Sequence, residues 1–258
     1  MYDFEMQLDI AAQIVGEASY VMALVGAGLS KESGIPTFRG GDGLWDKHGE
    51  PPMDGYQRFV EDPAGWWAQR LADQEKMGGF TQAIEEARPN AGHLALADME
   101  REGFLQHIIT QNIDNLHQVA GSLLVTEIHG NRTKMRCIEC SRRWPRAAFV
   151  SEEVPPRCPD CGGLVKSDTV MFGEPIPRDA LESCQRVAQQ ADVVLLIGTS
   201  AVVYPAAEFP LMVYRAGGKM IEVNPQETPL SEYCAAVLRA PSGEALPALL
   251  ERARALRG

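Results

Sequence analysis

The sequence predicts an α/β fold, in which a Rossmann-like, mostly parallel sheet carries helices on both faces and a small domain is added to it. Short apolar runs alternate with amphipathic stretches, which is typical of parallel strands joined by crossover helices. The first run, Val21–Val25, ends in the loop Gly26-Ala27-Gly28, as buried strands of nucleotide-binding α/β proteins do. Residues 35–90 and 132–166 break the alternation, and we expect them to build the small domain.

Hydrophobic periodicity places the other elements. A helix is expected before the first strand, because Phe4, Leu8 and Val15 recur at helical spacing. Further strands are expected at residues 108–110, 123–126, 193–197 and 219–223, and further helices at 90–102, 179–190 and 204–216. Both interruptions leave the sheet and return to it. The expected domains are therefore discontinuous: 1–34, 91–131 and 167–258 form the Rossmann-like domain, 35–90 a loop and helical insert, and 132–166 a separate module.

The composition is that of a globular protein. The chain has 258 residues, of which 45% are hydrophobic and 23% charged, so it can bury a sizeable core. Its net charge of −11 argues against binding nucleic acid through phosphates. Residues 132–166 carry eight Lys or Arg against four Asp or Glu, which we attribute to the solvated surface of a small module.

The N-terminus predicts a cytoplasmic protein. It carries acidic residues and lacks the basic start and cleavage site of a signal peptide. No apolar run approaches the ~18 residues of a membrane-spanning helix. We therefore expect no membrane partner. We also expect a monomer with no nucleic-acid partner.

Four cysteines have the spacing of a structural zinc site. They form two C-x2-C pairs separated by 17 residues: Cys137, Cys140, Cys158 and Cys161. Four thiolate ligands leave no open position for water or substrate, so one structural zinc ion is expected and the chemistry must lie elsewhere. The small domain then consists of a zinc-ribbon module and a helical insert. Cys184 and Cys234 are expected to be free thiols, because the zinc pattern fits a reducing compartment.

Small or polar residues follow several expected strands, at the sheet edge where ligands of such folds bind. The glycine loop alone does not distinguish a nucleotide site from a turn, because Lys31 replaces the third glycine of the dinucleotide fingerprint. Residues 111–115 offer amides and a carboxylate to ribose hydroxyls, a carboxamide or water, although helix capping also explains them. His129 follows an expected strand, and a structural role is open for it.

In their order, these motifs resemble those of the sirtuin family. Residues 26–39, with the pattern GAGLSxxSGIPTFR, resemble its signature loop. Further matching motifs are TQNIDNLH at 110–117, Glu127-x-His129-Gly130, the two C-x2-C pairs, FGEP at 172–175, GTS at 198–200 and VNP at 223–225. The resemblance extends from about residue 10 to residue 250, and the joint order of the motifs is more specific than any one of them.

The resemblance implies an NAD-dependent protein-lysine deacylase, in which NAD is a consumed co-substrate. The acyl oxygen of the modified lysine would attack C1′ of the nicotinamide ribose and release nicotinamide. His129, the general base, would take a proton from the ribose hydroxyls, a task that suits its pKa near neutrality. The products would be free lysine, nicotinamide and O-acyl-ADP-ribose, and the substrate would be an acylated protein segment bound as an extended strand.

The resemblance also assigns site residues position by position. The catalytic residues would be His129 and Asn112. Phe38 would shield the reacting C1′, and the carbonyl oxygen of Val170 would accept a hydrogen bond from the substrate lysine Nε. The other substrate contacts would be Phe172 and Gly173. The residues expected to bind NAD are Gly26, Ala27, Gly28, Ser30, Thr37, Phe38, Arg39, Gln111, Asn112, Ile113, Asp114, Gly198, Thr199, Ser200, Asn224, Pro225, Gln226 and Ser242.

Two positions bear on the cofactor loop and on acyl specificity, respectively. Many sirtuins have aspartate where this chain has Thr37, which we expect to affect how the cofactor loop is held without removing activity. Relatives that prefer succinyl or malonyl lysine carry a Tyr-x-x-Arg pair in the helical insert. Tyr56 is followed three positions later by Phe59, so that pair is missing. Because a buried carboxylate needs a partner, we expect neutral acyl groups, acetyl first.

Two other functions remain open from the sequence. An NAD glycohydrolase or ADP-ribosyltransferase on the same fold would use His129 and the cofactor pocket without a deacylation tunnel. A non-catalytic NAD-sensing module would keep the pocket but would have no need of a base at His129.

Overall fold

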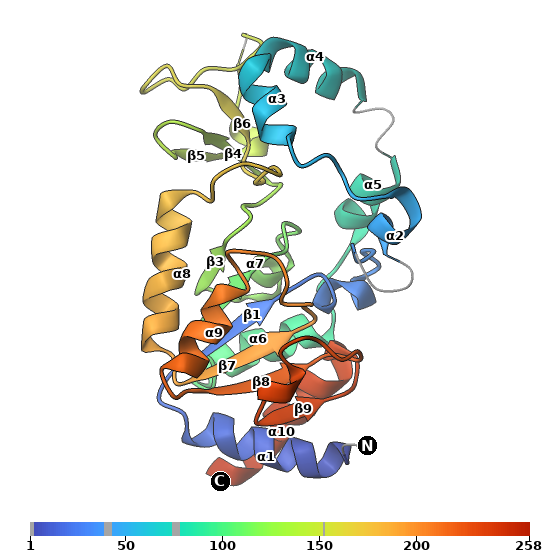
Figure 1. Ribbon diagram of the computed structural model, residues 1–258, viewed down its shortest axis with the longest axis vertical. Coiled ribbons are helices and arrows are strands. Elements are labelled where there is room, and N and C mark those ends of the chain that lie inside the picture. Colours follow the sequence, from blue (N-terminus) through green and yellow to red (C-terminus); the bar gives the residue numbers. More distant parts are fainter. Residues whose placement is uncertain (1–2, 39–42, 74–77, 152) are drawn as a thin grey trace.

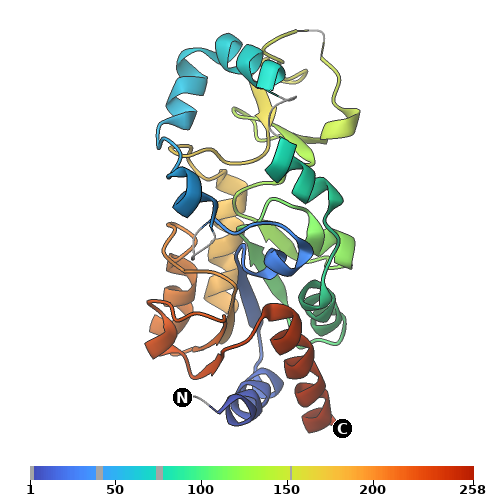
Figure 2. The ribbon, with the colours of Figure 1, turned by 90° about the vertical axis from the view of Figure 1, so that its right-hand side faces the viewer.

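The computed structural model describes residues 3–38, 43–73, 78–151 and 153–258. Two parts of unequal size are stacked along the long axis (Figure 1). The larger part contains a parallel sheet with helices on both faces, and both chain termini lie at its end (Figure 2). The smaller part contains an antiparallel sheet and two helices. Among the described residues, no helix combines the length and apolar character needed to cross a bilayer.

Within the described residues, the larger sheet has six strands, all parallel, in the order β3-β2-β1-β7-β8-β9. The strands are β1 (Val21–Val25), β2 (His107–Thr110), β3 (Val125–Glu127), β7 (Val193–Ile197), β8 (Lys219–Val223) and β9 (Ala236–Leu238). The chain runs outward from β1 to β3 and then returns to the other side of β1 at β7. The strand order therefore reverses between β1 and β7, which is where sheets of this kind bind ligands.

Helices cover both faces of this sheet. Those on one face are α1 (Phe4–Glu17), α6 (Ala91–Arg101) and α10 (Ser242–Arg257). Those on the other are α8 (Arg178–Gln190) and α9 (Glu208–Arg215). Successive residues of β1 enter the two cores in turn, Ala23 the first and Leu24 the second. Because both faces are covered, every residue of β1 is buried, which explains its uninterrupted apolar sequence.

The expected elements are mostly present, with some shifts. The strand expected at 123–126 starts at Val125, because Leu123 and Leu124 lie in an exposed turn whose backbone N–H groups donate to Glu100. The helix expected at 204–216 begins only at Glu208, after a series of turns. Two elements were not expected. β9 has three residues, too few for a periodic signal, and α10 contains Pro247, a residue type that disfavours a helix interior.

The smaller part combines an antiparallel sheet with the helical insert. Its strands lie in the order β5-β4-β6 and are β4 (Lys134–Cys137), β5 (Arg143–Pro145) and β6 (Val165–Ser167). The helices above them are α3 (Gly55–Glu61) and α4 (Pro63–Asp73) (Figure 1). Trp67 of α4 packs on Met135 and Val165 of the sheet, so the insert and the module share one core.

The remaining elements are short connections. They are α2 (Leu44–His48), α5 (Gly78–Glu86), α7 (Leu116–Ala120) and the 3-10 turns Leu29–Ser33, Arg146–Ala148 and Ser231–Tyr233. α2 and α5 lie beside the junction of the two parts (Figure 1). The turn at Leu29–Ser33 directly follows the glycine loop after β1 and ends at Gly34, whose φ of 86° is left-handed.

Candidate active site

Two glycine loops meet at the carboxyl ends of β1 and β7. Gly28 N donates to the carbonyl oxygen of Gly198 at 2.8 Å, and Gly26 N donates to that of Ile197 at 2.9 Å. A Cβ atom on Gly28 would lie 2.6 Å from the Cα of Gly198, and one on Gly26 would lie 2.8 Å from the Gly198 oxygen. The close approach of the loops therefore requires glycine at both positions, independently of any phosphate.

The polar segment after β2 is hydrogen-bonded to the glycine loop. Asn112 Nδ2 donates to the Gly26 carbonyl oxygen at 3.0 Å and to Ser30 Oγ at 3.1 Å. Ser30 Oγ in turn donates to Asp114 Oδ2 at 2.7 Å. Asp114 Oδ1 accepts from Leu116 N at 2.9 Å, so this carboxylate also caps α7. Capping and site building are thus not alternatives here: the same side chain does both.

Burial affects the charge of Asp114. Its carboxyl group is buried, and this desolvation raises its pKa, against the hydrogen bonds from Leu116 N and Ser30 that lower it. The group thus lies in a dry environment next to two hydrogen-bond donors. A polar ligand group that reached it would find a strong acceptor with little competing water.

The loops after β7 and β8 also form hydrogen bonds at the carboxyl edge of the sheet. Gln111 Nε2 donates to Thr199 Oγ1 at 2.9 Å, and Asn224 Nδ2 donates to the Thr199 carbonyl oxygen at 3.1 Å. Four neighbouring strands, β1, β2, β7 and β8, therefore contribute to one hydrogen-bonded edge. Ser200, Pro225 and Gln226 lie exposed just beyond it.

His129 lies in the loop after β3, half-buried, next to this edge. Its Nδ1 is 3.2 Å from the carbonyl oxygen of Gln111. A carbonyl oxygen only accepts, so Nδ1 carries the proton and Nε2 holds the lone pair. Desolvation lowers the pKa of His129, against the hydrogen bond to Gln111 that raises it. The imidazole is therefore neutral at neutral pH and has one basic nitrogen.

The segment expected to bind substrate lies directly against His129. Val170 N donates to the carbonyl oxygen of His129 at 2.9 Å, and Phe172 O accepts from Tyr56 N of α3 at 3.0 Å. Gly173 has a φ of 79°, and a Cβ there would lie 2.8 Å from the Met53 carbonyl oxygen. In the part of the chain that the structure describes, no group donates to the carbonyl oxygen of Val170.

Aromatic contacts connect the expected cofactor loop with the substrate segment. The Phe38 ring centroid lies 5.2 Å from that of Trp45 and 5.9 Å from that of Phe80. Trp45 in turn lies 5.6 Å from Phe172. Phe38 is 37% exposed. Thr37 O accepts from Leu44 N at 2.9 Å, whereas the predicted site residue Arg39 lies outside the described residues.

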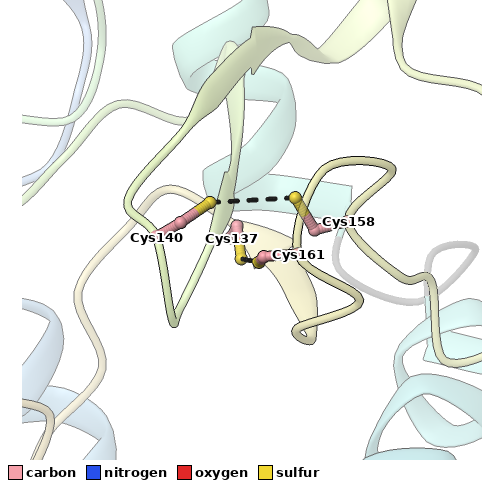
Figure 3. Close-up of side chains that lie close together, drawn as sticks. All are labelled: Cys137, Cys140, Cys158 and Cys161. Atoms are coloured by element: carbon pink, nitrogen blue, oxygen red, sulfur yellow. Dashed lines mark hydrogen bonds between the residues drawn. The ribbon is translucent and has the colours of Figure 1, made fainter.

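The four predicted metal ligands are gathered in the smaller part (Figure 3). Their sulfur atoms all lie within 4.8 Å of one another. Cys137 and Cys161 Sγ are 3.5 Å apart, and Cys140 and Cys158 Sγ are 3.8 Å apart. A tetrahedral zinc ion with Zn–S bonds of ~2.3 Å holds its sulfurs roughly 3.8 Å apart, whereas a disulfide requires ~2.05 Å. The geometry therefore fits a tetrahedral metal ion and excludes disulfides.

The other predicted site residues lie around this edge. Ala27 is between the two loop glycines, and the carbonyl oxygen of Ile113 accepts from Arg132 N at 3.1 Å. Ser242 begins α10, after the carboxyl end of β9, and is buried. It lies beside the start of α6, where a Cβ on Gly92 would be 3.2 Å from its carbonyl carbon.

Sequence reasoning missed two groups of residues. Asn90 Nδ2 donates to the Leu29 carbonyl oxygen at 2.7 Å and to Ser33 Oγ at 3.0 Å, which ties α6 to the glycine loop. Its spacing from His93, with which it forms a capping box, was the available signal. The second group is a set of buried charges that includes Lys166 and Glu174. No local pattern marks these residues as buried.

Known proteins share this sequence and architecture. The model of the Sir2 family matches residues 26–205. An NAD-dependent protein deacylase of Thermococcus kodakarensis is 43% identical over 250 residues, 95% of each protein. A solved Sir2 homologue in complex with NAD is 38% identical, with a TM-score of 0.78, and the match covers 100% of this chain and 96% of that one. A Sir2 protein with a deacetylated p53 peptide and 3′-O-acetyl ADP ribose is 34% identical, with a TM-score of 0.76 and coverage of 97% and 98%.

Proposed function

The chain belongs to the Sir2 family, and from this premise we propose that it is an NAD-dependent protein-lysine deacylase, with acetyl-lysine as its preferred substrate. The observation that carries the proposal is the position of His129. The His129 ring is oriented by the carbonyl oxygen of Gln111, which leaves Nε2 as the basic nitrogen. The backbone carbonyl oxygen of His129 accepts a hydrogen bond from Val170 N, next to the polar strand ends. A base, the expected nucleotide-binding edge and a backbone acceptor that has no donor among the described residues thus lie together.

The role of His129 is that of a general base. With the proton on Nδ1, the ring accepts a proton at Nε2 from a ribose hydroxyl. The Gln111 carbonyl oxygen holds the ring orientation and stabilises the imidazolium that forms. Because burial lowers the pKa of His129, the neutral form persists below the ordinary pKa of ~6.5. The base is therefore ready at neutral pH.

NAD is expected at the carboxyl edge of the larger sheet. Most backbone N–H groups of the Gly26–Ser30 segment already donate within the protein, but among the described residues those of Ala27, Thr199 and Ser200 have no internal acceptor. We expect these N–H groups to face a pyrophosphate, which the loop glycines allow to approach the backbone closely. Gln111, Asn112 and Asp114 supply amide and carboxylate groups for the ribose and the carboxamide. Each of these side chains is already hydrogen-bonded, so its orientation is set before the ligand arrives. The solved relative with NAD supports this placement.

The acylated substrate is expected to bind as a strand beside residues 170–173. The free carbonyl oxygen of Val170 would accept from the lysine Nε–H, as the family resemblance implies. Exposed Val202 and Tyr204 lie on the loop after β7 that would form the other side of this site. The products would be free lysine, nicotinamide and O-acyl-ADP-ribose, consistent with the ligands of the related complex. We also propose a monomeric, cytoplasmic protein.

The cysteine cluster is expected to hold one zinc ion with a structural role. Its four sulfur atoms all lie within 4.8 Å of one another, and four thiolates this close repel one another, so a bound cation is needed to hold them together. A zinc ion would stabilise the fold of the smaller part, which carries the residues from Lys166 onward toward the substrate segment. With four protein ligands it has no position for substrate.

The helical insert favours neutral acyl groups. Arg70 is the cation of α4, and its guanidinium lies 5.3 Å from the centroid of the Trp66 ring. Trp67 stands three positions before Arg70, where the clamp of desuccinylating relatives has a tyrosine, so the clamp is incomplete. Strong desuccinylation by this protein would contradict this argument and would point to Arg70.

Incubation with NAD and an acetyl-lysine peptide tests the proposal. Free lysine, nicotinamide and O-acetyl-ADP-ribose should form in equal amounts, and nicotinamide should not form without peptide. A panel of acetyl, butyryl, myristoyl and succinyl lysine peptides ranks the acyl groups. Loss of NAD that does not depend on peptide would instead indicate a glycohydrolase.

His129→Ala should lower kcat about 10²–10⁴-fold, the usual contribution of a general base. His107→Gln is the matched control. His107 is also a partly buried histidine whose pKa is lowered by desolvation, but it starts β2 at the opposite edge and binds Thr126 Oγ1 at 2.8 Å. The control should keep kcat within about twofold. Equal activity of His129→Ala and wild type would show that the base lies elsewhere.

A further inference from the structure

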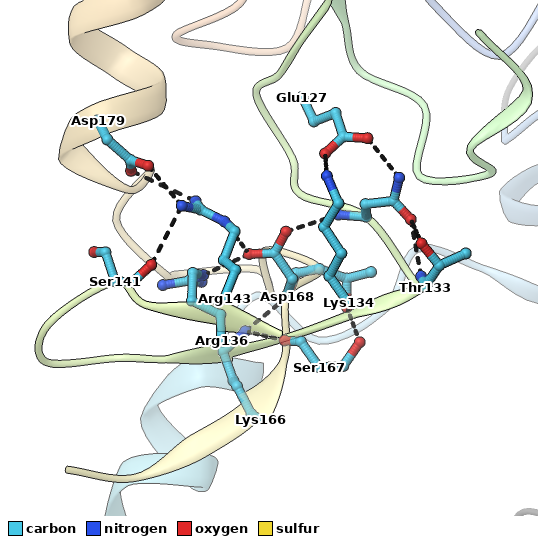
Figure 4. Close-up of polar contacts among 12 residues, drawn as sticks. Glu127, Thr133, Lys134, Arg136, Ser141, Arg143, Lys166, Ser167, Asp168 and Asp179 are labelled. Atoms are coloured by element: carbon cyan, nitrogen blue, oxygen red, sulfur yellow. Dashed lines mark hydrogen bonds and ion pairs between the residues drawn. The ribbon is translucent and has the colours of Figure 1, made fainter. Parts of the chain in front are cut away.

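Buried charges lie in the small sheet and in the chain that follows it, and Figure 4 shows Arg136, Lys166 and Asp168 among them. Arg136 of β4 and Lys166 of β6 are paired across the small sheet, and their side chains are 4% and 0% exposed. Asp168 and Glu174, 1% and 3% exposed, are their partners. Two buried cations thus face two buried anions. Such a set is costly to bury, so it is weak support for stability by itself and raises the question of its function.

Glu174 connects the cations to the substrate segment. Its Oε1 pairs with Arg136 Nη2 at 2.5 Å, and its Oε2 pairs with Lys166 Nζ at 2.9 Å. Oε2 also accepts from the backbone N–H of Met171 at 2.8 Å. Glu174 N donates to the Met171 carbonyl oxygen at 3.0 Å, which closes a turn over residues 171–174. The Glu174 carboxylate therefore holds Met171 at the start of the turn, and the Glu174 backbone N–H closes its end.

Lys166 holds the same segment from its other end. Its Nζ donates to the carbonyl oxygens of Ser167 at 3.0 Å and Thr169 at 2.7 Å, in addition to the pair with Glu174. All three donors of the ammonium group are used. Asp168, the residue between those two carbonyls, pairs with Arg136 and accepts from Asn131 N at 3.1 Å, next to His129.

The anchored groups follow one another along the backbone. Lys166 holds Thr169 O, His129 O holds Val170 N, Glu174 holds Met171 N, and Tyr56 N holds Phe172 O. Among described residues, the carbonyl oxygen of Val170 has no donor, although both of its neighbours are fixed. An acceptor with fixed orientation and no internal partner is what a substrate N–H needs.

We propose that Lys166 and Glu174 are positioning residues for the acyl-lysine substrate, which hold the Thr169–Met171 backbone so that the Val170 carbonyl oxygen is presented to it. The inference rests on the proposed deacylase function, because it assigns a role within that reaction. Charges suit the task, since charge-assisted hydrogen bonds hold a backbone more rigidly than neutral ones. Neither side chain touches the reacting atoms. Their effect on catalysis is through the position of Val170.

The test compares the KM for peptide with the KM for NAD in Glu174→Gln and Lys166→Met. Each variant should raise the KM for an acetyl-lysine peptide at least tenfold and leave the KM for NAD within twofold. A purely structural role would lower thermal stability without this selectivity. Peptide KM values within twofold of wild type in both folded variants would overturn the proposal.

Asp192→Asn is the matched control. Asp192 also uses a carboxylate to hold a loop backbone, accepting from Ser19 N at 2.8 Å and Tyr20 N at 3.0 Å, but it lies at the opposite edge of the larger sheet. This variant should lose some stability and keep both KM values within twofold. A selective rise in its peptide KM would mean that the assay reports stability, which would also overturn the proposal.

Two measurements cover variants that fail to fold. The double variant Lys166→Met/Glu174→Gln leaves neither residue as an unpaired buried charge, and its peptide KM should be close to that of the more affected single variant. In the wild-type protein, amide hydrogen exchange at Met171 should be as slow as in the core strands, and fast exchange would overturn the proposal. Absence of any peptide-dependent NAD turnover by wild type would contradict the proposed function, whereas the exchange measurement still decides whether the segment is held.

Discussion

The two sheets of the molecule are stabilised by different interactions. The larger sheet lies between two apolar cores, and all five residues of β1 are buried and apolar. The small sheet has a few buried apolar side chains, such as Met135 and Val165, and also buries Arg136 and Lys166. A module of this size cannot bury enough apolar surface to fold alone, so ion pairs, and the metal ion that we propose for the cysteine cluster, would supplement its core. We therefore expect single substitutions to unfold the smaller part while the larger sheet stays folded.

Loss of the metal site should have the largest effect. Cys137→Ala should abolish zinc binding and lower deacylation at least about 100-fold, because structural zinc contributes on the order of 10 kcal/mol to such modules. The larger sheet should remain folded, since its cores do not include the cysteine cluster. Metal content, circular dichroism and peptide deacylation measure the three effects.

Cys184→Ala is the control for that prediction. Cys184 is fully buried as well, but it lies on α8 in the second apolar core. Its replacement removes one buried sulfur and no ligand, so activity and zinc content should stay within about twofold of wild type. A folded, fully active Cys137→Ala protein would show that the small sheet does not depend on a metal ion.

Replacing one charge should have the next largest effect. Arg136→Met leaves Asp168 and Glu174 with one partner fewer, and breaking a buried pair in this way costs about 3–5 kcal/mol. Amide exchange should accelerate in β4 and β6 first. Leu195→Ala, in the core of the larger sheet, should cost about 2–5 kcal/mol but accelerate exchange in the parallel strands. The same exchange pattern in both variants would mean that the two sheets unfold as one unit.

Acid should destabilise the larger part through His93 and His117, whose rings lie 5.2 Å apart. Desolvation lowers the pKa of His93 to about 4 and that of His117 to about 3, and the described residues offer no hydrogen-bond partner to either ring nitrogen of His117. Between the ordinary pKa of ~6.5 and these values, only the unfolded chain binds protons there. The free energy of unfolding therefore falls as the pH drops below ~6.5. Each of the two histidines contributes up to about 1.4 kcal/mol per pH unit to this decrease.

His117→Leu should flatten this dependence. Denaturant unfolding at pH 7, 6 and 5 measures the slope, which should fall by up to about 1.4 kcal/mol per pH unit in the variant. The effect should be small at pH 7, where the wild-type imidazole is neutral in both folded and unfolded chains. An unchanged slope would mean that other groups control the acid sensitivity.

The strands β1, β7 and β8 lie at the expected residues. β1 and β7 are uninterrupted apolar runs, because they are covered on both faces, whereas β8 also contains Lys219 and Glu222. β9 was missed because three buried residues carry no period. The predictions of family and fold class are confirmed. The individual site residues remain predictions, since the structure shows where they lie and not what they bind.

The candidate site could be predicted only in part, for the same reason. Gly26, Asn112 and His129 stand out by motif, and Glu174 is part of the FGEP motif, but nothing in the sequence indicates that Lys166 or Glu174 is buried. Their burial depends on the pairing of β4 with β6 and on the turn that brings Glu174 back to both cations. Exposure of a charged side chain is a property of its neighbours in space, and no local pattern contains it.

By itself, the sequence determined the family, the parallel sheet and the four thiols, because each can be read from the order and spacing of residues along the chain. Only the tertiary structure decided how Ser30 meets Asp114, 84 residues away, and which nitrogen of His129 carries the proton. It also decided that Gly28 is required by Gly198. Hydrogen-bond partners and exclusion of water arise from strands that are distant in sequence. They exist only once the chain is folded.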